Sequence, residues 1–190
     1  KVYLEHPAYD DYPVVNVSYE GALLYCAWLT QQLHTQFPGE YDNYHFRLPA
    51  KEEFTYAAQA GHEFAPYPWG GFYLQNARGQ KLANFNAIGS ESIARDPETG
   101  ELELVKNHKL PPKVDEFSVL APAVSYVEND FGAYNMCGNA AEMTLEKGLA
   151  MGGSWRSPGY DIRVFSEMPY DEPNPEVGFR PVLALSANNF

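Results

Sequence analysis

Residues 132–142 read Gly-Ala-Tyr-Asn-Met-Cys-Gly-Asn-Ala-Ala-Glu, and they are the most informative stretch of the chain. The segment from Asn135 to Met143 has the signature of a compact loop. Gly138 permits a positive φ angle, which residues with a side chain resist. We therefore expect irregular, closely packed backbone here, with short strands and loops through the rest of the C-terminal half.

Two helices are predicted upstream of this loop. Ser18 is a suitable N-cap, and Glu20 in the first turn favours a helix from there to about Gln36, where Pro38-Gly39 follows. Leu24, Trp28 and Leu33 supply its apolar stripe, helped by Cys26 and Ala27. A second helix is expected from about Ala50 to Ala60, with Gly61 at its C-terminal stop.

Short strands are predicted at both ends of the chain. They cover Val14–Val17, His45–Leu48, Met151–Trp155 and Val177–Leu185. Residues 87–113 are rich in charge and contain Pro97, Gly100, Pro111 and Pro112, which is typical of a long surface excursion. The pattern predicts one α+β domain over residues 1–190, with two early helices, short antiparallel strands and much irregular loop.

Composition excludes several classes of protein. With 45% hydrophobic residues the chain can bury a core, so it is not a disordered segment. Its formal net charge of −12 disfavours nucleic acid as a partner. No apolar run is long enough to span a membrane, and Lys1 to Asp11 does not resemble a signal peptide. Sequence alone leaves open whether Cys26 and Cys137 pair or stay free.

A series of short strings resembles one family, the sulfatase-modifying-factor or formylglycine-generating-enzyme domain, a variant of the C-type-lectin-like fold. In chain order they are Pro13-Val14-Val15-x-Val17-Ser18, Phe46-Arg47-Leu48-Pro49-Ala50, Tyr67-Pro68-Trp69-Gly70-Gly71, Ala83-Asn84-Phe85, Asp115-x-Phe117, Ala121-Pro122, the 132–142 stretch, Gly152-Gly153-Ser154-Trp155 and Gly178-Phe179-Arg180-Pro181. Each string is weak alone, but their shared order across the chain is specific.

A narrower resemblance is to gliding-motility lipoproteins of the type IX secretion system. The stretch His6-Pro-Ala-Tyr-Asp-Asp-Tyr-Pro-Val-Val15 carries it. It implies a position outside the cytoplasm, in the periplasm or at the outer membrane, with other envelope proteins as partners. Membrane contact would come only through a lipid anchor outside this chain.

The family resemblance also implies calcium. One site would use Asn84, Phe85, Asp115 and Phe117, and a second would use Cys137, Gly138, Ala140 and Glu142. Mixed carbonyl and carboxylate oxygens suit that ion. The alternatives are that Asn84 and Asp115 cap turns, and that Glu142 pairs with a buried cation such as Arg180. The family usually has Trp where this chain has Ala141, and an aromatic residue where it has Met143, so this loop is expected to be covered differently.

Two departures from the family pattern bear on catalysis. Active members carry two cysteines after the Gly-Gly-Ser-aromatic string, and those positions fall here on Ser157 and about Ile162. Neither side chain replaces a thiolate as a copper ligand or redox group, so we expect no copper. The five histidines show no ligand spacing, so neither zinc nor iron is expected. The family's usual N-terminal strands also have no counterpart upstream of the first helix.

The resemblance places a ligand or partner groove after Ser154. Its candidate residues are Trp155, Arg156, Ser157, Tyr160, Asp161 and Arg163. An arginine beside a tyrosine can bind a carboxylate or a peptide, and the alternative is an ordinary salt-linked surface loop.

The sequence therefore favours a non-catalytic, calcium-stabilised binding or scaffold module of a cell-envelope assembly. Two other functions stay open: an enzyme of the formylglycine-generating type, and a lectin-like ligand-binding protein.

Overall fold

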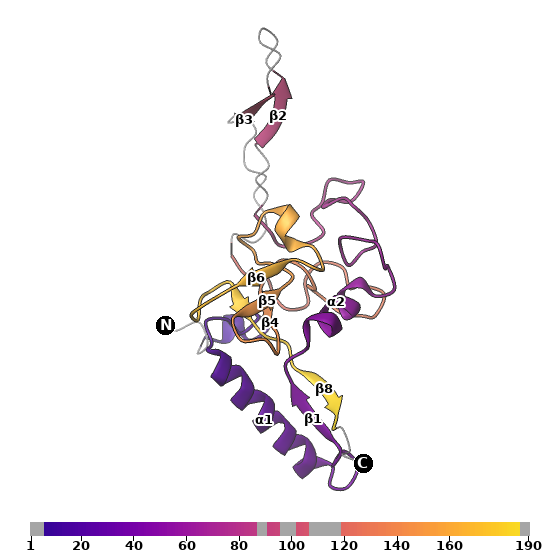
Figure 1. Cartoon of the computed structure of the whole chain (residues 1–190), viewed down its shortest axis with the longest axis vertical. Coiled ribbons are helices and arrows are strands. Elements are labelled where there is room, and N and C mark those ends of the chain that lie inside the picture. The colour runs from indigo at the N-terminus through magenta and orange to yellow at the C-terminus, as the bar shows by residue number, and fades with distance from the viewer. Residues whose placement is uncertain (1–5, 87–90, 96–101, 107–118, 187–190) are drawn as a thin grey trace.

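The computed structural model describes residues 6–86, 91–95, 102–106 and 119–186, with the backbone alone for 91–95 and 102–106 (Figure 1). The helical elements are η2 (Pro7–Tyr9), α1 (Tyr19–Gln36), α2 (Lys51–Gln59) and η3 (Gly159–Ile162). The strands are β1 (Tyr44–Arg47), β2 (Glu91–Arg95), β3 (Leu102–Lys106), β4 (Ala141–Met143), β5 (Leu149–Met151), β6 (Glu167–Pro169), β7 (Val177–Gly178) and β8 (Val182–Leu185). Two helices followed by short strands and long irregular segments confirm the predicted α+β class.

Helix α1 has the predicted limits, but of the residues predicted for its apolar stripe only Cys26 is fully buried. Ser18 Oγ accepts a hydrogen bond from the Gly21 N–H at 3.0 Å, as an N-cap should. The buried residues are Ala22 and Cys26, whereas Leu24 and Trp28 are 72% and 51% exposed. Small side chains allow the helix to lie close to the core, and this places the larger ones towards solvent.

Helix α2 confirms its prediction to within a residue at each end. Phe54 and Ala58 are its buried residues. Its first turn is capped by Glu53, whose Oε2 accepts from the Ala50 N–H at 2.7 Å. Arg47 binds the same carboxylate with two hydrogen bonds of 2.6 Å, which lowers the pKa of Glu53 to about 2. Ala60 closes the helix with a φ of 47°, one residue before Gly61.

The central sheet has the strand order β6-β5-β4-β7. Its β4–β7 pair is parallel, which corrects the expectation of antiparallel strands only. The predicted strand from Met151 to Trp155 is also wrong beyond its first residue, because Gly152 and Gly153 turn the chain with φ angles of 82° and 66°. The predicted strand from Val177 to Leu185 is broken into β7 and β8 around Pro181, which has no N–H for a ladder.

A second sheet pairs β1 with β8, antiparallel, beside α1 (Figure 1). The predicted N-terminal strand at Val14–Val17 is reduced to a single bridge between Val15 and Gly178. Within the predicted 87–113 excursion, β2 and β3 form an antiparallel pair that lies apart from the other labelled elements in Figure 1, and the rest of that segment is outside the described residues.

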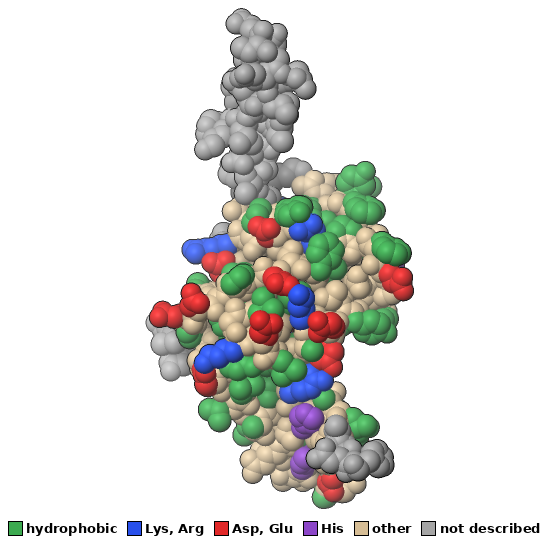
Figure 2. Space-filling view, viewed as in Figure 1, with side chains coloured by type: hydrophobic (Ala, Val, Ile, Leu, Met, Phe, Trp, Pro, Cys, Tyr) green, Lys and Arg blue, Asp and Glu red, His purple; other side chains and the backbone are tan. Residues whose placement is uncertain are grey.

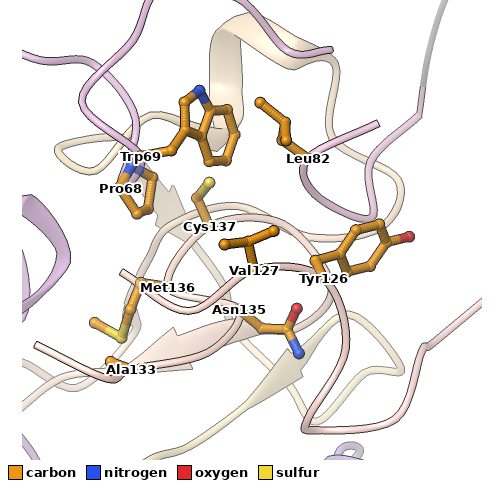
Figure 3. A pocket seen from close by; sticks show the side chains of 9 residues that line it. All are labelled: Pro68, Trp69, Leu82, Tyr126, Val127, Ala133, Asn135, Met136 and Cys137. Carbon is orange, nitrogen blue, oxygen red and sulfur yellow. The ribbon is translucent and has the colours of Figure 1, made fainter. Parts of the chain in front are cut away.

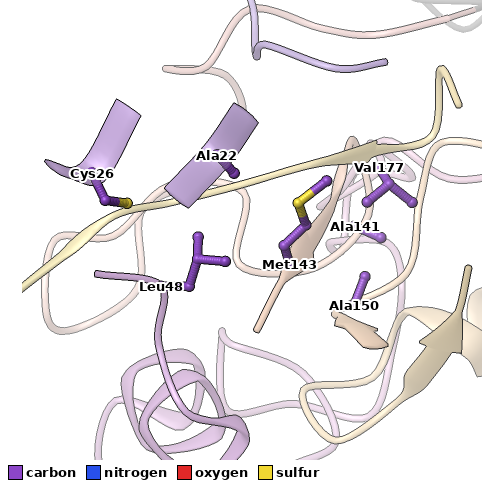
Figure 4. Close-up of a cluster of buried hydrophobic side chains, with 7 residues drawn as sticks. All are labelled: Ala22, Cys26, Leu48, Ala141, Met143, Ala150 and Val177. Atoms are coloured by element: carbon purple, nitrogen blue, oxygen red, sulfur yellow. The ribbon is translucent and has the colours of Figure 1, made fainter. Parts of the chain in front are cut away.

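The main core cluster joins α1 to the central sheet. Figure 4 shows Cys26 and Ala22 from α1 on one side and residues of β4, β5 and β7 on the other. The full cluster is Ala22, Cys26, Leu48, Ala141, Met143, Ala150 and Val177. Ala141 and Met143 thus sit in this core without the large aromatic side chains that the family pattern would supply. In the part of the chain that the structure describes, no helix is long and apolar enough to cross a membrane.

Candidate functional site

Ser157 lies in a tight turn directly after the Gly152-Gly153 pair. Its Oγ accepts a hydrogen bond from the Ser154 N–H at 3.0 Å, and its N–H donates to the Ser154 carbonyl at 3.0 Å. The Ser154 hydroxyl donates in turn to Glu176 Oε2 at 2.7 Å. The Ser157 hydroxyl therefore helps to hold the shape of a turn.

Ile162 ends the short helix η3 and is completely buried. It packs in a cluster with Tyr67, Ala83, Phe85 and Cys137. An apolar side chain in this place contributes to the core and has no group that could accept an electron or bind a metal.

The two cysteines of the chain are free, buried and located in different clusters. Cys26 belongs to the cluster that joins α1 to the central sheet, and Cys137 belongs to the cluster that contains Ile162. Burial raises the pKa of both thiols above the usual value, most strongly for Cys137. Both therefore remain neutral thiols at neutral pH, which are poor nucleophiles and poor metal ligands.

The predicted groove residues divide into two groups, and one of them is salt-linked. Arg156 Nη1 lies 3.4 Å from Glu176 Oε1, and its guanidinium stacks 4.8 Å from the Trp155 ring. The Trp155 indole N–H donates to the Pro175 carbonyl at 3.3 Å. Trp155 and Arg156 are thus tied to the segment that precedes β7, and Ser157 is linked to that segment only through Ser154.

The second group surrounds Arg163. Its guanidinium carbon is 3.4 Å from the ring centre of Tyr160 and 4.8 Å from that of Phe165, and its Nε donates to the Tyr160 carbonyl at 2.7 Å. Asp161 is exposed, and its backbone N–H donates to the Pro158 carbonyl. Among the described residues, its carboxylate forms no ion pair with Arg156 or Arg163. The guanidinium of Arg163 therefore stacks between two aromatic rings.

Figure 2 shows acidic and basic side chains interspersed over the visible face of the protein.

Asn84 connects the two predicted calcium groups. Its Nδ2 donates to the Val119 carbonyl at 2.6 Å and to Asn139 Oδ1 at 3.1 Å, and its own carbonyl accepts from the Asn139 N–H at 2.7 Å. Asn139 also exchanges hydrogen bonds with Ala121. Asn84 and Phe85 are buried beside the Gly138 loop, whereas Asp115 and Phe117 lie outside the described residues.

Glu142 forms an ion pair with Arg180, which is the alternative that the sequence left open. Arg180 Nη2 and Nε contact Glu142 Oε1 at 2.6 and 3.0 Å, and Nε contacts Oε2 at 2.9 Å. Arg180 Nη2 also donates to the Tyr134 carbonyl at 2.9 Å. The buried carboxylate raises the pKa of Arg180. A cation at Glu142 would therefore share its carboxylate with this guanidinium.

The side-chain oxygen of Asn135, in the same loop, has no hydrogen-bond partner. The sequence analysis did not assign a role to this residue. Its Nδ2 donates to the carbonyls of Pro122 and Ala123 at 3.2 and 2.8 Å, whereas its Oδ1 is buried without a partner. Its φ of 52° is one that Asn tolerates better than most residues. A buried acceptor without a donor can be satisfied by an ordered water or by a cation. Cys137, Gly138 and Ala140 supply backbone carbonyls in the same loop, and carbonyl oxygens are a ligand type that calcium accepts.

A small pocket lies above this loop. Figure 3 shows Trp69, Pro68 and Leu82 on one side and Val127, Tyr126 and Asn135 on the other, with the Cys137 sulfur between them. Its lining is mostly apolar. Its polar lining groups are the Tyr126 phenol, the Asn135 amide and the Cys137 thiol, with no carboxylate or imidazole among its lining residues.

Comparison with known proteins identifies the family, and the relatives include both enzymes and proteins whose names call them inactive. The model of the sulfatase-modifying factor enzyme 1-like domain matches residues 3–185. The chain is 30% identical over 136 residues to the formylglycine-generating enzyme of Bos taurus, covering 72% of this chain and 27% of that protein. It is 27% identical over 153 residues to the inactive C-alpha-formylglycine-generating enzyme 2 of Mus musculus, covering 80% of this chain and 35% of that protein. The chain thus spans about a quarter to a third of the length of these relatives.

Solved structures share the fold at low sequence identity. Treponema denticola variable protein 1 matches with a TM-score of 0.62 at 16% identity, covering 92% of this chain and 72% of that one. PvdO from Pseudomonas aeruginosa matches with a TM-score of 0.59 at 20% identity, covering 90% of this chain and 61% of that one. These likenesses extend over nearly the whole described fold.

Proposed function

The chain belongs to the sulfatase-modifying factor enzyme 1-like domain family, and on this premise we propose that it is a non-catalytic binding module of a cell-envelope protein assembly. The observation that carries the proposal is the state of the two positions where active members have cysteine. Ser157 holds a turn through Ser154, and Ile162 is completely buried in the core. Ile162 fills a closely packed part of the core, so this position provides packing and no redox-active thiol.

The remaining thiols give no substitute for that pair. Cys26 and Cys137 belong to separate buried clusters, and burial raises the pKa of each. The relatives that match include a protein whose name describes it as inactive, so loss of catalysis has a precedent in the family.

A binding role is supported by side chains that face solvent. Tyr160 is 69% exposed while it stacks on Arg163, and Phe64, Phe72 and Tyr73 are exposed by 91%, 73% and 81%. Aromatic residues and arginine are enriched in protein interfaces. The partners are therefore proposed to be other proteins. The acidic charge of −12 argues against nucleic acid.

The cellular setting follows from the narrower resemblance. The entry string from His6 to Val15 resembles gliding-motility lipoproteins of the type IX secretion system, so we place the protein outside the cytoplasm, in an envelope complex of that kind. A lectin-like ligand-binding role is the alternative that the sequence left open. The likeness to the Treponema variable protein shows a shared fold and does not decide between the two roles.

Catalysis is tested with a cysteine-containing sulfatase peptide. We expect no conversion of its cysteine to formylglycine, with or without added copper, because Ser157 and Ile162 supply no thiolate. Product is followed by mass spectrometry, and an active formylglycine-generating enzyme assayed in parallel shows that the peptide is competent. Conversion above the no-protein background would establish the enzymatic alternative.

We also propose that calcium stabilises the loops that contain Asn84 and Gly138. The first group would be Asn84 and Phe85 with Asp115 and Phe117. The second would be the carbonyls of Cys137, Gly138 and Ala140 with Glu142, and we propose the unpartnered Asn135 Oδ1 of the same loop as a further ligand. The Asn84–Asn139 hydrogen bonds would couple the two groups.

Calcium removal is expected to lower the melting temperature. An ion at a hundredfold excess over its Kd stabilises the native state by about 2.7 kcal/mol. For a domain of this size that corresponds to roughly 5–10 °C. Differential scanning calorimetry with calcium and then with a chelator measures the shift.

Asn135→Ala should reduce that calcium-dependent shift in melting temperature. The control is Asn129→Ala, because Asn129 is also a loop amide but its Oδ1 already accepts from the N–H groups of Phe131 and Ala133. The control should destabilise the protein yet keep the full calcium effect. Identical melting curves of the unmodified protein with and without calcium would reject the ion sites.

A further inference from the structure

Arg180 occupies the carboxylate of the second proposed calcium group. Its Nε lies 3.0 Å from Glu142 Oε1 and 2.9 Å from Oε2, and its Nη2 lies 2.6 Å from Oε1. The same Nη2 donates to the Tyr134 carbonyl at 2.9 Å. One guanidinium therefore links β4 to the residue that precedes Asn135, which is also part of the proposed group.

This ion pair is only partly open to solvent. Glu142 has 9% of its side chain exposed, and Arg180 has 39%. The negative charge of Glu142 raises the pKa of Arg180, so the guanidinium keeps its charge at any physiological pH. A permanent positive charge therefore lies against Glu142.

The other oxygens of the second group carry no charge. Among the described residues, the carbonyls of Cys137 and Gly138 accept no backbone hydrogen bond, although both residues are buried. Asn135 Oδ1 has no donor either. Ordered water or an ion can satisfy oxygens of this kind. Glu142 is therefore the one source of negative charge within the second group.

Arg180 weakens Glu142 as a calcium ligand in two ways. Glutamate often binds calcium through both carboxylate oxygens, but here both accept hydrogen bonds from the guanidinium. The guanidinium also repels a second cation near the same carboxylate. With Arg180 in place, the second group offers calcium no net negative charge, and ligand charge is one of the factors that set the affinity for this ion.

We propose that Arg180 competes with calcium for Glu142 and thereby makes the second group a low-affinity site. The inference rests on the proposed calcium binding and adds the residue that sets its affinity. Calcium sites of proteins range from Kd values of about 10⁻⁹ M to about 10⁻³ M, and extracellular modules lie at the weak end, at about 10⁻⁴ to 10⁻³ M. The second group would therefore fill only where calcium is abundant, as it is outside the cytoplasm.

The competition keeps Glu142 paired with a cation in both conditions. Where calcium is scarce, Arg180 neutralises the carboxylate. Where calcium is abundant, the ion takes over the carboxylate, and Arg180 can turn its partly exposed charge towards solvent. Removal of Arg180 would leave a buried carboxylate without a cation, so it should strengthen calcium binding.

Isothermal titration calorimetry of the full chain compares the unmodified protein with Arg180→Met. Methionine removes the charge and keeps an extended side chain. The calcium affinity of the second group should therefore rise by roughly tenfold or more. In a chelator the variant should melt at a lower temperature than the unmodified protein, and calcium should raise its melting temperature by more.

Two controls identify the site. Arg156→Met removes a 60% exposed cation that pairs with Glu176, so it should leave the calcium affinity unchanged. Glu142→Gln removes the contested carboxylate, so it should abolish the weak binding step, and adding Arg180→Met to it should not restore that step.

A measurement on the unmodified protein covers the case in which Arg180→Met does not fold. In nitrogen-15 NMR spectra, the Arg180 Nε–H signal should shift and its proton should exchange faster as the weak step fills, because the guanidinium gives up Glu142.

The outcomes separate this inference from the calcium proposal on which it rests. Absence of calcium binding in the unmodified protein and in Arg180→Met would reject both. Calcium binding with the same affinity in the two proteins would overturn the role of Arg180 alone. An Arg180 signal that stays unchanged while the step lost in Glu142→Gln fills would also overturn it.

Discussion

Gly138→Ala is expected to destabilise the protein by about 3 kcal/mol or more, since it combines two separate penalties. The φ angle of Gly138 is 68°, and a residue with a side chain loses about 1–2 kcal/mol in this region. An added Cβ would also overlap the backbone carbonyl oxygen of Asn84. That carbonyl cannot retreat freely, because it accepts the Asn139 N–H within the buried amide network.

Gly132→Ala separates the two penalties. Gly132 has a similar φ of 78°, but a Cβ there would meet nothing within 4 Å. This control should lose only the conformational part, about 1–2 kcal/mol. Urea denaturation of both variants measures the difference. If the two variants lose the same stability, the close approach of Asn84 to the loop is not what constrains Gly138.

Glu142→Gln is the second change with a large expected effect. It removes the charge that faces Arg180, and Glu142 has only 9% of its side chain exposed. Loss of one partner from a fully buried ion pair costs about 3–5 kcal/mol. Arg180 is 39% exposed and can recover some hydration, so we expect about 2–3 kcal/mol here. Denaturation in the presence of a chelator keeps any bound calcium from contributing to the result.

The matched control is Glu20→Gln, which breaks the exposed pair with Lys147. The side chains of this pair are 62% and 67% exposed, so its loss should leave the free energy of unfolding almost unchanged. A double-mutant cycle with Arg180→Met should give a coupling energy of about 1–3 kcal/mol between positions 142 and 180. A Glu142→Gln variant as stable as the Glu20→Gln control would show that the ion pair does not hold the loop.

Local signals in the sequence predicted the two helices well. Ser18 and Glu20 set the start of α1, and Gly61 marks the region where α2 ends. The predicted buried face of α1 was right at Cys26 and wrong at Leu24 and Trp28, because the spacing of apolar residues does not show which face a neighbouring strand will cover. The strand limits failed where glycine and proline interrupt an apolar run, at Gly152 and Pro181.

Only some residues of the candidate site could be predicted from the sequence. Glu142 was found, and its pairing with Arg180 was one of the two alternatives. The role of Asn135 was missed because an unpartnered oxygen is a property of the folded loop. Its signal in the sequence is only an asparagine shortly before a glycine, within the Gly-x-Tyr-Asn string. Nor does the sequence show that Arg163 stacks between Tyr160 and Phe165, which are three residues before it and two after it.

Native mass spectrometry of the protein, gently extracted from its own source, tests the central claim most directly. A non-catalytic binding module of an envelope assembly should appear bound to polypeptides other than itself, and sequencing these would identify the partners. Masses that correspond only to this protein or to its own copies, under conditions that preserve known envelope complexes from the same source, would contradict the account.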